Sequence, residues 1–336
     1  MKIVFLETDK EKAEYVRNRL GDIGKHEIVF FSEELDKTGL GKIKDAEGIV
    51  LFVDSEIDRK VMRDLPELKY VATMSTGYDH IDIESAKEFG INVSNVPSYG
   101  ENTVAEHTFG LILNLSRKIW KGIESVKKSD DFVLEGLQGF DLKGKTLGVI
   151  GAGHIGQHVI KIANGFQMEV IAFNKSRDEE LAGKLGFKYV ELDELLEKSD
   201  VITLHVPLTE ETKHMINKNN IGKVRKGSIL INTSRGEIIE TGALRWALDE
   251  GILAGAGLDV LEEEEDFGEE AELFKKKEKV SDWRALIENH LLIDYDNVIV
   301  TPHMAFYTKE AEQRILDMTV ENVKAFLGGK VKNKVV

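Results

Sequence analysis

The sequence predicts an α/β protein built from two doubly wound parallel-sheet domains. Three observations support this fold class. Short apolar runs alternate with helical patterns along most of the chain, which is typical of parallel sheets covered by helices. A glycine-rich turn stands between a strand pattern and a helix pattern within residues 146–166. The length of 336 residues is sufficient for two domains of this kind.

The first domain is expected to occupy about the first hundred residues, where strand and helix patterns alternate. This part of the sequence has no glycine-rich phosphate turn of its own. Its strands are expected at residues 2–7, 48–53, 70–75 and 91–94, and its helices at residues 10–20, 59–64 and 83–89.

A single long helix is expected over residues 101–128, because this stretch lacks proline and repeats apolar side chains at helical spacing. The apolar positions are Val104, Phe109, Leu111, Ile112 and Leu115. Such a helix would form a rigid connector between the two domains. Residues 129–144 are expected to form a loop.

The nucleotide-binding unit is expected to consist of a strand at residues 146–150, a helix at 155–166 and a second strand at 168–173. Between the first strand and the helix stand Gly151, Ala152, Gly153, His154, Ile155 and Gly156. Gly151 permits the tight turn, Gly153 lets a pyrophosphate approach the backbone, and Gly156 allows close packing of helix and strand. The phosphates would meet N–H groups at the positive end of the helix. The alternative is an ordinary glycine-rich turn.

One position departs from the NAD-binding pattern. An acidic residue is expected at the end of the second strand, where it holds the ribose hydroxyls. Here the position is Asn174, followed by Lys175, Ser176 and Arg177. Asparagine does not repel a 2′-phosphate, and the two basic side chains could attract one, so the predicted cofactor is NAD or NADP. Alternatively, both basic side chains point to solvent and NAD is favoured.

The rest of the second domain continues the alternation of strands and helices. Strands are expected at residues 201–205, 228–232, 252–259 and 298–301, and helices at residues 237–250 and 308–327. Residues 261–296 interrupt this pattern with four consecutive glutamates and then three consecutive lysines. This stretch is expected to be a mostly helical insertion exposed to solvent.

Composition excludes several classes of function. The net charge of −15 argues against a surface for nucleic acid or anionic membranes. No apolar run approaches the roughly 20 residues needed to span a bilayer, and residues 1–7 are typical of a strand rather than a signal peptide. The absence of cysteine excludes disulfides, thiolate metal sites and cysteine catalysis. A cytoplasmic location is expected.

Polar residues end or follow four strands of the second domain, where open α/β sheets bind their ligands: His205, Arg235, Asp259 and His303. Arg235 could hold a carboxylate through two parallel hydrogen bonds. His303 could give a proton to an oxygen on which charge develops, and a carboxylate from Asp259 or residues 262–265 could stabilise its protonated form. This set indicates reduction of a 2-keto acid. The alternatives are a surface ion pair at Arg235, a plain turn at residues 301–303 and a solvated acidic run.

The other histidines carry weaker signals. His154 and His158 stand four residues apart on one helix, a spacing that can bind metal, but no third ligand is near in the sequence. No metal site is expected. Structural or surface roles are expected for His26, His80, His107, His214 and His290.

Taken together, seven groups of residues resemble the D-isomer-specific 2-hydroxyacid dehydrogenase family over nearly the whole chain. These groups are residues 75–82, 104–108, 151–156, 204–209 with 214–217, 231–236, 257–260 and 301–303. The long gap between Glu264 and His303, with residues 305–308 after the histidine, resembles the D-lactate dehydrogenase branch. Glyoxylate and phosphoglycerate reductases have a shorter insertion there.

The resemblance implies reversible NAD(P)H-dependent reduction of a small 2-keto acid to the D-2-hydroxy acid. Arg235 would bind the substrate carboxylate, His303 would be the acid/base, and Glu264 would be its paired glutamate. Asp259 would contact the nicotinamide carboxamide. The implied cofactor-binding residues are Gly151, Gly153, His154, Ile155, Gly156, Asn174, His205, Val206, Pro207, Thr233 and Asp259. The implied substrate-binding residues are Thr76, Gly77, Tyr78, Tyr99 and Arg235.

The resemblance also implies how the domains are arranged in the sequence. A Rossmann domain of residues 101–303 would be inserted in a flavodoxin-like substrate domain of residues 1–100, completed by about residues 304–336. A homodimer with the connecting helix at its interface is implied as well. Two other functions stay open: a glyoxylate or hydroxypyruvate reductase, and a non-catalytic nucleotide-sensing module like the corepressor relatives that keep this fold.

Overall fold

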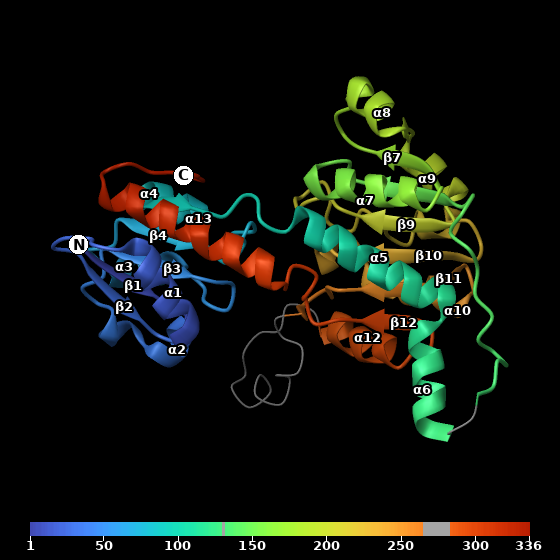
Figure 1. The fold of residues 1–336 in the computed structure, drawn as a ribbon, viewed down its shortest axis with the longest axis horizontal. Coiled ribbons are helices and arrows are strands. Elements are labelled where there is room, and N and C mark those ends of the chain that lie inside the picture. Colours follow the sequence, from blue (N-terminus) through green and yellow to red (C-terminus); the bar gives the residue numbers. More distant parts are fainter. Residues whose placement is uncertain (130–131, 265–282) are drawn as a thin grey trace. The chain divides into compact units, whose positions relative to one another are not determined.

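The structure, a computed structural model, describes residues 1–129, 132–264 and 283–336. The chain divides into two compact units (Figure 1). The first comprises Met1–Tyr99 and Tyr307–Val336, and the second comprises Gly100–Phe306. Each unit contains a parallel β-sheet with helices packed on it, which confirms the predicted fold class.

The sheet of the first unit has five parallel strands in the order β2-β1-β3-β4-β5. The strands are β1 (Lys2–Phe5), β2 (Glu27–Phe30), β3 (Gly48–Leu51), β4 (Tyr70–Thr73) and β5 (Asn92–Ser94). Every residue of β3 and β4 is buried, as their continuous apolar runs predict. The strand order is that of flavodoxin-like sheets.

Four helices from the N-terminal part of the chain and one from the C-terminal part cover this sheet. They are α1 (Lys10–Leu20), α2 (Leu35–Thr38), α3 (Arg59–Asp64), α4 (Ile83–Phe89) and α13 (Lys309–Leu327), with a short 3-10 helix, η1 (Leu40–Lys42). The ring of Phe326 in α13 stacks on Tyr70 of β4 with centroids 4.1 Å apart. The hydroxyl of Tyr15 in α1 donates to Asp317 of α13 at 2.8 Å. The end of the chain is therefore an integral part of the first unit.

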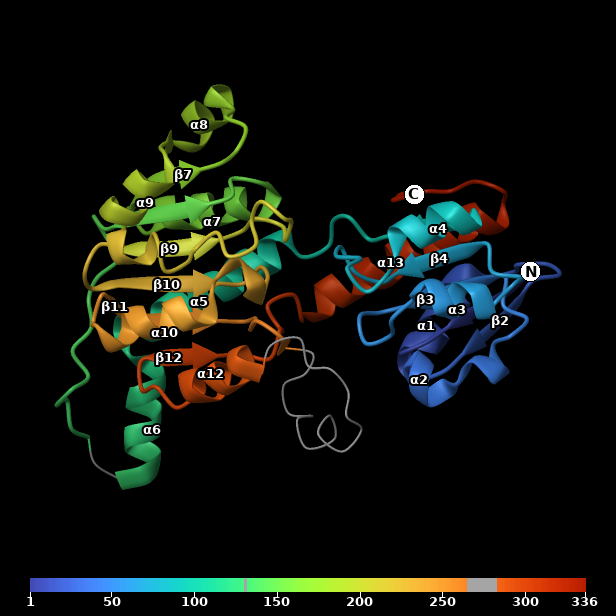
Figure 2. The same cartoon turned by 180° about the vertical axis from the view of Figure 1, so that it is seen from behind.

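The sheet of the second unit has seven parallel strands in the order β12-β11-β10-β9-β6-β7-β8 (Figures 1 and 2). They are β6 (Thr146–Ile150), β7 (Glu169–Phe173), β8 (Lys188–Tyr189), β9 (Val201–Leu204), β10 (Ser228–Asn232), β11 (Leu253–Leu258) and β12 (Val298–Val300). Because all strands are parallel, their carboxyl ends meet at one edge of the sheet. The loops after β10, β11 and β12 there carry the predicted site.

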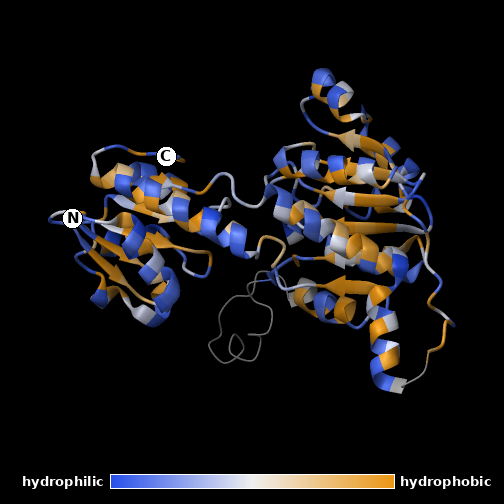
Figure 3. Cartoon of the chain, in the orientation of Figure 1, coloured by the Kyte–Doolittle hydropathy of each residue, from blue (hydrophilic) through white to orange (hydrophobic). Residues whose placement is uncertain are grey.

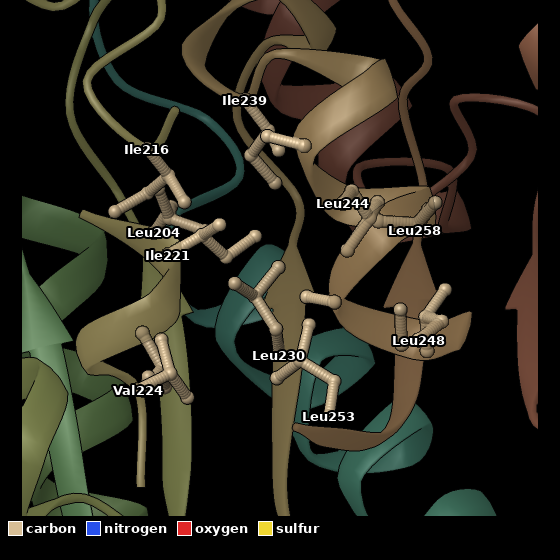
Figure 4. Close-up of a cluster of buried hydrophobic side chains, with 14 of the residues drawn as sticks. Leu204, Ile216, Ile221, Val224, Leu230, Ile239, Leu244, Leu248, Leu253 and Leu258 are labelled. Carbon is tan, nitrogen blue, oxygen red and sulfur yellow. The ribbon is translucent and has the colours of Figure 1, made fainter. Parts of the chain in front are cut away.

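Helices cover both faces of the second sheet. They are α5 (Glu101–Arg117), α6 (Ile119–Ser129), α7 (His154–Gly165), α8 (Glu179–Leu185), α9 (Leu192–Lys198), α10 (Thr241–Asp249) and α12 (Trp283–Ile293), with 3-10 helices η2 (Ile221–Lys223) and η3 (Gly236–Ile238). One core joins the sheet to α5, α7 and α8, and another joins it to α9, α10 and α12. Figure 4 shows strand residues of the second core, including Leu230 and Leu258, with Leu244 and Leu248 of α10.

Hydropathy follows this layering: the strands of both sheets are coloured mostly hydrophobic in Figure 3, whereas the surface helices are mixed. Within the part of the chain that the structure describes, no helix is long and apolar enough to cross a membrane.

The prediction of a single helix over residues 101–128 is wrong, because the helix is interrupted at Lys118. This residue is in the left-handed conformation, with φ of 51°, and ends α5. The backbone N–H of Phe140 donates to the carbonyl of Ser116 at 2.8 Å, and Gly139 packs directly on the same carbonyl. The loop that returns to β6 thus hydrogen-bonds to the Ser116 carbonyl, which would accept a hydrogen bond within a continued helix. The next helix, α6, runs in a different direction from α5 (Figure 1).

The helix predicted at residues 237–250 begins later than expected. The N–H of Ile216 donates to the carbonyl of Ile238, and that of Glu240 donates to the carbonyl of Ile216. These bonds keep Ile239 and Glu240 extended between η3 and the start of α10 at Thr241.

Of the insertion predicted at residues 261–296, residues 265–282 lie outside the described residues, and residues 283–293 form the helix α12. The predicted exposure to solvent is wrong for Leu261, Glu262, Leu286, Asn289 and Leu292, which are buried because they pack beside α10 and the sheet.

Candidate active site

The loops after β11 and β12 bring together the histidine and glutamate that the sequence paired. Nδ1 of His303 lies 2.6 Å from Oε1 of Glu264. The other carboxylate oxygen of Glu264 accepts a hydrogen bond from the backbone N–H of Leu261 at 3.0 Å. Since Nδ1 faces the carboxylate, Nε2 is the ring nitrogen that remains for a substrate.

The contact with Glu264 controls the charge of His303. Burial alone would lower the pKa of the imidazole, and the positive charge of Arg235 acts in the same direction. The hydrogen bond and negative charge of Glu264, helped by Asp259, more than offset both, so the pKa of His303 is raised above its usual value. The geometry therefore favours an imidazolium that can act as an acid near neutral pH.

Asp259 holds the loop that carries His303. Its carboxylate, in a residue only 1% exposed, accepts hydrogen bonds from the hydroxyl of Thr301 and the backbone N–H groups of Met304 and Ala305. Its carbonyl accepts from the N–H of His303 at 2.8 Å. Nε2 of His107 lies 3.4 Å from one carboxylate oxygen. The carboxylate thus fixes the left-handed turn at His303, where φ is 47°; its contact with the cofactor stays a prediction.

Arg235 lies in a tight turn after β10 that Asn232 stabilises. The side-chain amide of Asn232 donates to the carbonyl of Arg235 at 2.8 Å, and its oxygen accepts from the N–H and hydroxyl of Ser234. One guanidinium nitrogen of Arg235 donates to the carbonyl of Ser234 at 2.8 Å. These contacts set the direction of the guanidinium, which is close enough to His303 to influence its charge.

His214 has a partner that could not be found from the sequence. Nε2 of His214 lies 2.5 Å from Oε1 of Glu262, the first residue of the acidic run. The sequence predicts only a structural or surface role for this histidine and no separate role for Glu262. The pair joins residues 48 apart in the sequence, so no local pattern signals it.

The glycine-rich turn has the shape that a dinucleotide requires. Gly151 has φ of 99°, and a Cβ atom there would lie 2.6 Å from the carbonyl oxygen of His205. A Cβ atom on Gly156 would lie 2.1 Å from the carbonyl oxygen of Gly151, whereas Gly153 faces open space. The helix α7 begins at His154 without a side-chain cap, so its first N–H groups are available to an anion. This cradle fits a pyrophosphate.

The residues after β7 are engaged with one another and with acidic side chains. The amide of Asn174 donates to the carbonyl of Ser176 at 2.6 Å. Lys175 pairs with Glu211 at 2.6 Å and Arg177 pairs with Glu191 at 2.5 Å. Both ion pairs are exposed, so they contribute little to stability and can exchange partners.

His205 follows β9 at the nucleotide edge of the sheet. One ring nitrogen, Nε2, lies 2.9 Å from the hydroxyl of Thr203, and the buried Nδ1 has no hydrogen-bond partner among the described residues. Burial lowers the pKa of His205 to about 3, so the ring is neutral at physiological pH. Directly after β10, the hydroxyl of Thr233 lies 3.1 Å from that of Thr108 in α5.

The predicted carboxylate-binding loop of the first unit follows β4. The hydroxyl of Thr76 donates to the carbonyl of Val96 at 2.8 Å, and the hydroxyl of Ser75 donates to the carbonyl of Gly77 at 2.6 Å. Among the described residues, no acceptor contacts the backbone N–H groups of residues 76–78. The carbonyl of Tyr99 accepts from Arg314 at 2.6 Å. The loop therefore presents N–H donors in a fixed conformation.

A glycine cradle that fits a dinucleotide and a histidine–glutamate pair at strand ends of the same sheet are typical of dinucleotide-dependent dehydrogenases. Comparison with known proteins makes this specific. Residues 109–305 match the family described as D-isomer specific 2-hydroxyacid dehydrogenase, NAD binding domain. The chain belongs to this family and is an NAD-dependent oxidoreductase of the 2-hydroxyacid dehydrogenase type.

Individual relatives cover almost the full chain. A 2-hydroxyacid dehydrogenase homolog from Zymomonas mobilis is 40% identical over 311 residues, which is 91% of each chain. A glyoxylate reductase from Thermococcus litoralis is 37% identical over 88% of this chain and 85% of the relative. The crystal structure of a D-lactate dehydrogenase from Aquifex aeolicus, complexed with NAD and lactic acid, has a TM-score of 0.86 and 37% identity, covering 97% and 96% of the two chains.

Proposed function

We propose that the protein reversibly reduces a small 2-keto acid, of the size of pyruvate, to the D-2-hydroxy acid. When bound, the nicotinamide would supply the hydride to the carbonyl carbon. His303 would donate its proton to the carbonyl oxygen during reduction and take one back during oxidation. Arg235 would hold the substrate carboxylate.

The observation that carries this proposal is the 2.6 Å contact between His303 and Glu264. A general acid works best when its pKa lies near the operating pH, and Glu264 raises the pKa of the imidazole despite burial and the nearby guanidinium. Arg235 has five N–H donors in a planar fork, which matches the two oxygens of a carboxylate. A 2-keto acid carries a carbonyl group for His303 and a carboxylate for Arg235 on adjacent carbon atoms.

The remaining residues of the proposed site hold the cofactor and the substrate. The cradle of Gly151, Gly153, His154, Ile155 and Gly156 would bind the pyrophosphate, and Asn174 would face the ribose. His205, Val206, Pro207, Thr233 and Asp259 would line the path to the nicotinamide. In the first unit, the backbone N–H groups of Thr76, Gly77 and Tyr78 would donate to the substrate carboxylate, with Tyr99 beside them.

Pyruvate and glyoxylate are both candidate substrates, because the chain is similar to a D-lactate dehydrogenase and to glyoxylate reductases. The test is a panel of pyruvate, glyoxylate, hydroxypyruvate and larger 2-keto acids with NADH and with NADPH, followed by chiral analysis of the product. We expect pyruvate to have the highest kcat/KM and the product to be the D isomer. A higher kcat/KM for glyoxylate would assign the protein to the second activity. Binding of NADH without turnover of any 2-keto acid would support a nucleotide-sensing module instead.

The homodimer implied by the family resemblance has a candidate interface on α6. Apolar side chains at helical spacing are exposed on this helix, which extends away from the sheet of its unit (Figures 1 and 3). They are Ile119, Trp120, Ile123 and Val126, followed by Phe132 and Leu134, which are 91% and 83% exposed. Monomers rarely expose a contiguous apolar patch of this kind. We therefore propose that this surface packs on a second copy of the chain.

Replacing Trp120 with aspartate tests this interface, because it places a charge at the centre of the apolar face. We expect the parent protein to be a dimer by light scattering after size exclusion and Trp120→Asp to be a monomer. Lys128→Asp on the charged face of α6 is the matched control and should stay dimeric. A monomeric parent would refute the proposed interface.

A further inference from the structure

Glu262 is a buried carboxylate with three separate anchors. It is 8% exposed, and its Oε1 lies 2.5 Å from Nε2 of His214. Its Oε2 accepts hydrogen bonds from the backbone N–H and the hydroxyl of Thr241, at 3.2 and 2.7 Å. Its carbonyl accepts from the side-chain amide of Asn289 in α12 at 2.6 Å. Burying a carboxylate is costly unless it is paired, so this arrangement fixes the backbone at residue 262.

His214 connects Glu262 to the segment that carries Arg235. The backbone N–H of His214 donates to the carbonyl of Glu237 at 2.7 Å, two residues after the arginine. Residues Ile216 and Ile239 continue this contact as a parallel bridge. His214 itself is in the left-handed conformation, with φ of 50°. One residue thus contacts the loop after β10 with its backbone and the loop after β11 with its side chain.

Gly236 lets these two loops touch directly. A Cβ atom on Gly236 would lie 2.0 Å from the carbonyl carbon of Leu261 and 2.2 Å from the nitrogen of Glu262. Only glycine allows the peptide between those residues to pack there. The N–H of Leu261 in turn donates to Glu264 at 3.0 Å. The peptide between Leu261 and Glu262 therefore links the position of Glu264 to that of Arg235.

We propose that Glu262 and His214 are positioning residues that hold the peptide 261–262 against Gly236 and thereby fix the arginine and the acid/base pair in register. The assignment of substrate and proton roles to Arg235 and His303 rests on the proposed function. The contacts that hold the peptide do not.

Loss of the Glu262 carboxylate should disturb the acid/base pair. The turn at residues 261–264 would be released from Thr241 and His214, and Glu264 would move from His303. The charged groups that act on His303 are Glu264, Arg235 and Asp259, of which Glu264 raises its pKa most. Weakening that contact should therefore lower the pKa of His303. Misplacement by about 1 Å can cost on the order of a hundredfold in rate.

The primary test measures His303 directly and needs no turnover. An NMR titration of the full-length ¹⁵N-labelled protein follows the ring of His303, which is assigned with His303→Gln. We expect Glu262→Ala and His214→Ala to lower the pKa of His303. Glu262→Gln keeps an oxygen for Thr241 and should largely restore the parent value. Glu250→Gln, which makes the same charge change at the exposed end of α10, should leave it unchanged.

Kinetics then separate positioning from a general structural role. We expect Glu262→Ala to lower kcat/KM for the keto acid on the order of a hundredfold, with unchanged affinity for NADH. In a Glu264→Gln background the same substitution should produce no further shift of the pH profile, because its effect acts through Glu264.

The titration decides the proposal in each case. An unchanged pKa of His303 in folded Glu262→Ala or His214→Ala protein overturns it. If Glu262→Ala does not fold, His214→Ala gives the answer by the same measurement. If the pKa shifts but the parent protein turns over no 2-keto acid, the positioning role stands and the proposed function fails.

Discussion

His303 and His205 both follow strands of the same parallel sheet, yet their surroundings have opposite effects on protonation. His303 has Glu264 at 2.6 Å, and its pKa is raised. Among the described residues, the ring of His205 has the hydroxyl of Thr203 as its hydrogen-bond partner, and burial lowers its pKa to about 3. The accompanying carboxylate therefore decides whether the pKa of each of these two histidines is raised or lowered.

The same contrast separates the two halves of this sheet edge. The loops after β10, β11 and β12 hold ionised groups in fixed contacts, which suits proton transfer and carboxylate binding. The loops after β6 and β9 offer backbone N–H groups, glycines and a neutral ring, which suit a dinucleotide. Exposed ion pairs after β7, such as that of Lys175, complete the nucleotide side. Chemistry and cofactor binding therefore have different electrostatic requirements within one sheet.

The largest expected effect comes from removing the acid itself. His303→Gln keeps a polar side chain but cannot donate a proton near neutral pH, so turnover should fall roughly a hundred- to ten-thousandfold. Affinity for NADH should change little, because the glycine cradle is untouched. Steady-state kinetics and fluorescence titration with NADH measure the two quantities. Turnover within a factor of about ten of the parent would remove His303 from the acid/base role.

Arg235→Lys is expected to have the next largest effect. Lysine keeps the charge but lacks the planar fork, so the two-point contact with the carboxylate is lost. Truncating a buried charge partner costs on the order of 2–5 kcal/mol, so kcat/KM should fall by at least about tenfold. Thermal unfolding should be unchanged, which separates binding from folding. Parent-like efficiency on keto acids would place the arginine in a surface role.

Glu264→Gln should shift the pH dependence rather than abolish activity. In the proposed mechanism, reduction needs the imidazolium form of His303, which is lost as pH rises through its pKa. Glu264 raises that pKa, so its removal should move the fall in reduction activity to lower pH. Oxidation needs the neutral ring, so in the variant the rise of oxidation activity with pH should also move to lower pH. The pH profiles of kcat/KM in both directions test this, and identical profiles in parent and variant would place Glu264 outside the site.

The fold class could be predicted from the sequence because a buried parallel strand is a continuous run of apolar residues. Continuous apolar runs predicted β3, β4 and β6, and glycine spacing predicted the cradle. The strand β2 was not predicted, because it is a half-buried edge strand whose pattern is weak. The break at Lys118 was also missed, since neither glycine nor proline marks it. It arises because the loop at Gly139 and Phe140 captures the carbonyl of Ser116.

The site shows the same division. Arg235, Asp259 and His303 could be selected because each follows a strand, and strand ends meet at one edge. Resemblance to a family, rather than spacing, singled out Glu264 from the acidic run. The pairing of Glu262 with His214 could not be found, because it depends on how two loops 48 residues apart fold against each other.

The smallest expected effect concerns the nucleotide side, at Asn174. An aspartate there would repel a 2′-phosphate, whereas Asn174 is uncharged and lies in a turn with Ser176. Lys175 and Arg177 are held in exposed ion pairs, and such pairs generally contribute at most about 1 kcal/mol. A charge-assisted hydrogen bond to a phosphate is worth about 1.5–3 kcal/mol, so either side chain could exchange its partner for NADPH.

We therefore expect the parent protein to use NADPH at an efficiency within about a hundredfold of NADH. Asn174→Asp should shift the ratio of the two efficiencies toward NADH, because the new charge repels the phosphate and accepts hydrogen bonds from the ribose hydroxyls. Asn219→Asp, the same change at an exposed position away from the cradle, should leave the ratio unmoved. If the ratio is equally unmoved in Asn174→Asp, Asn174 does not face the ribose. The nucleotide side would then owe its specificity to the glycine cradle and the neutral groups after β9.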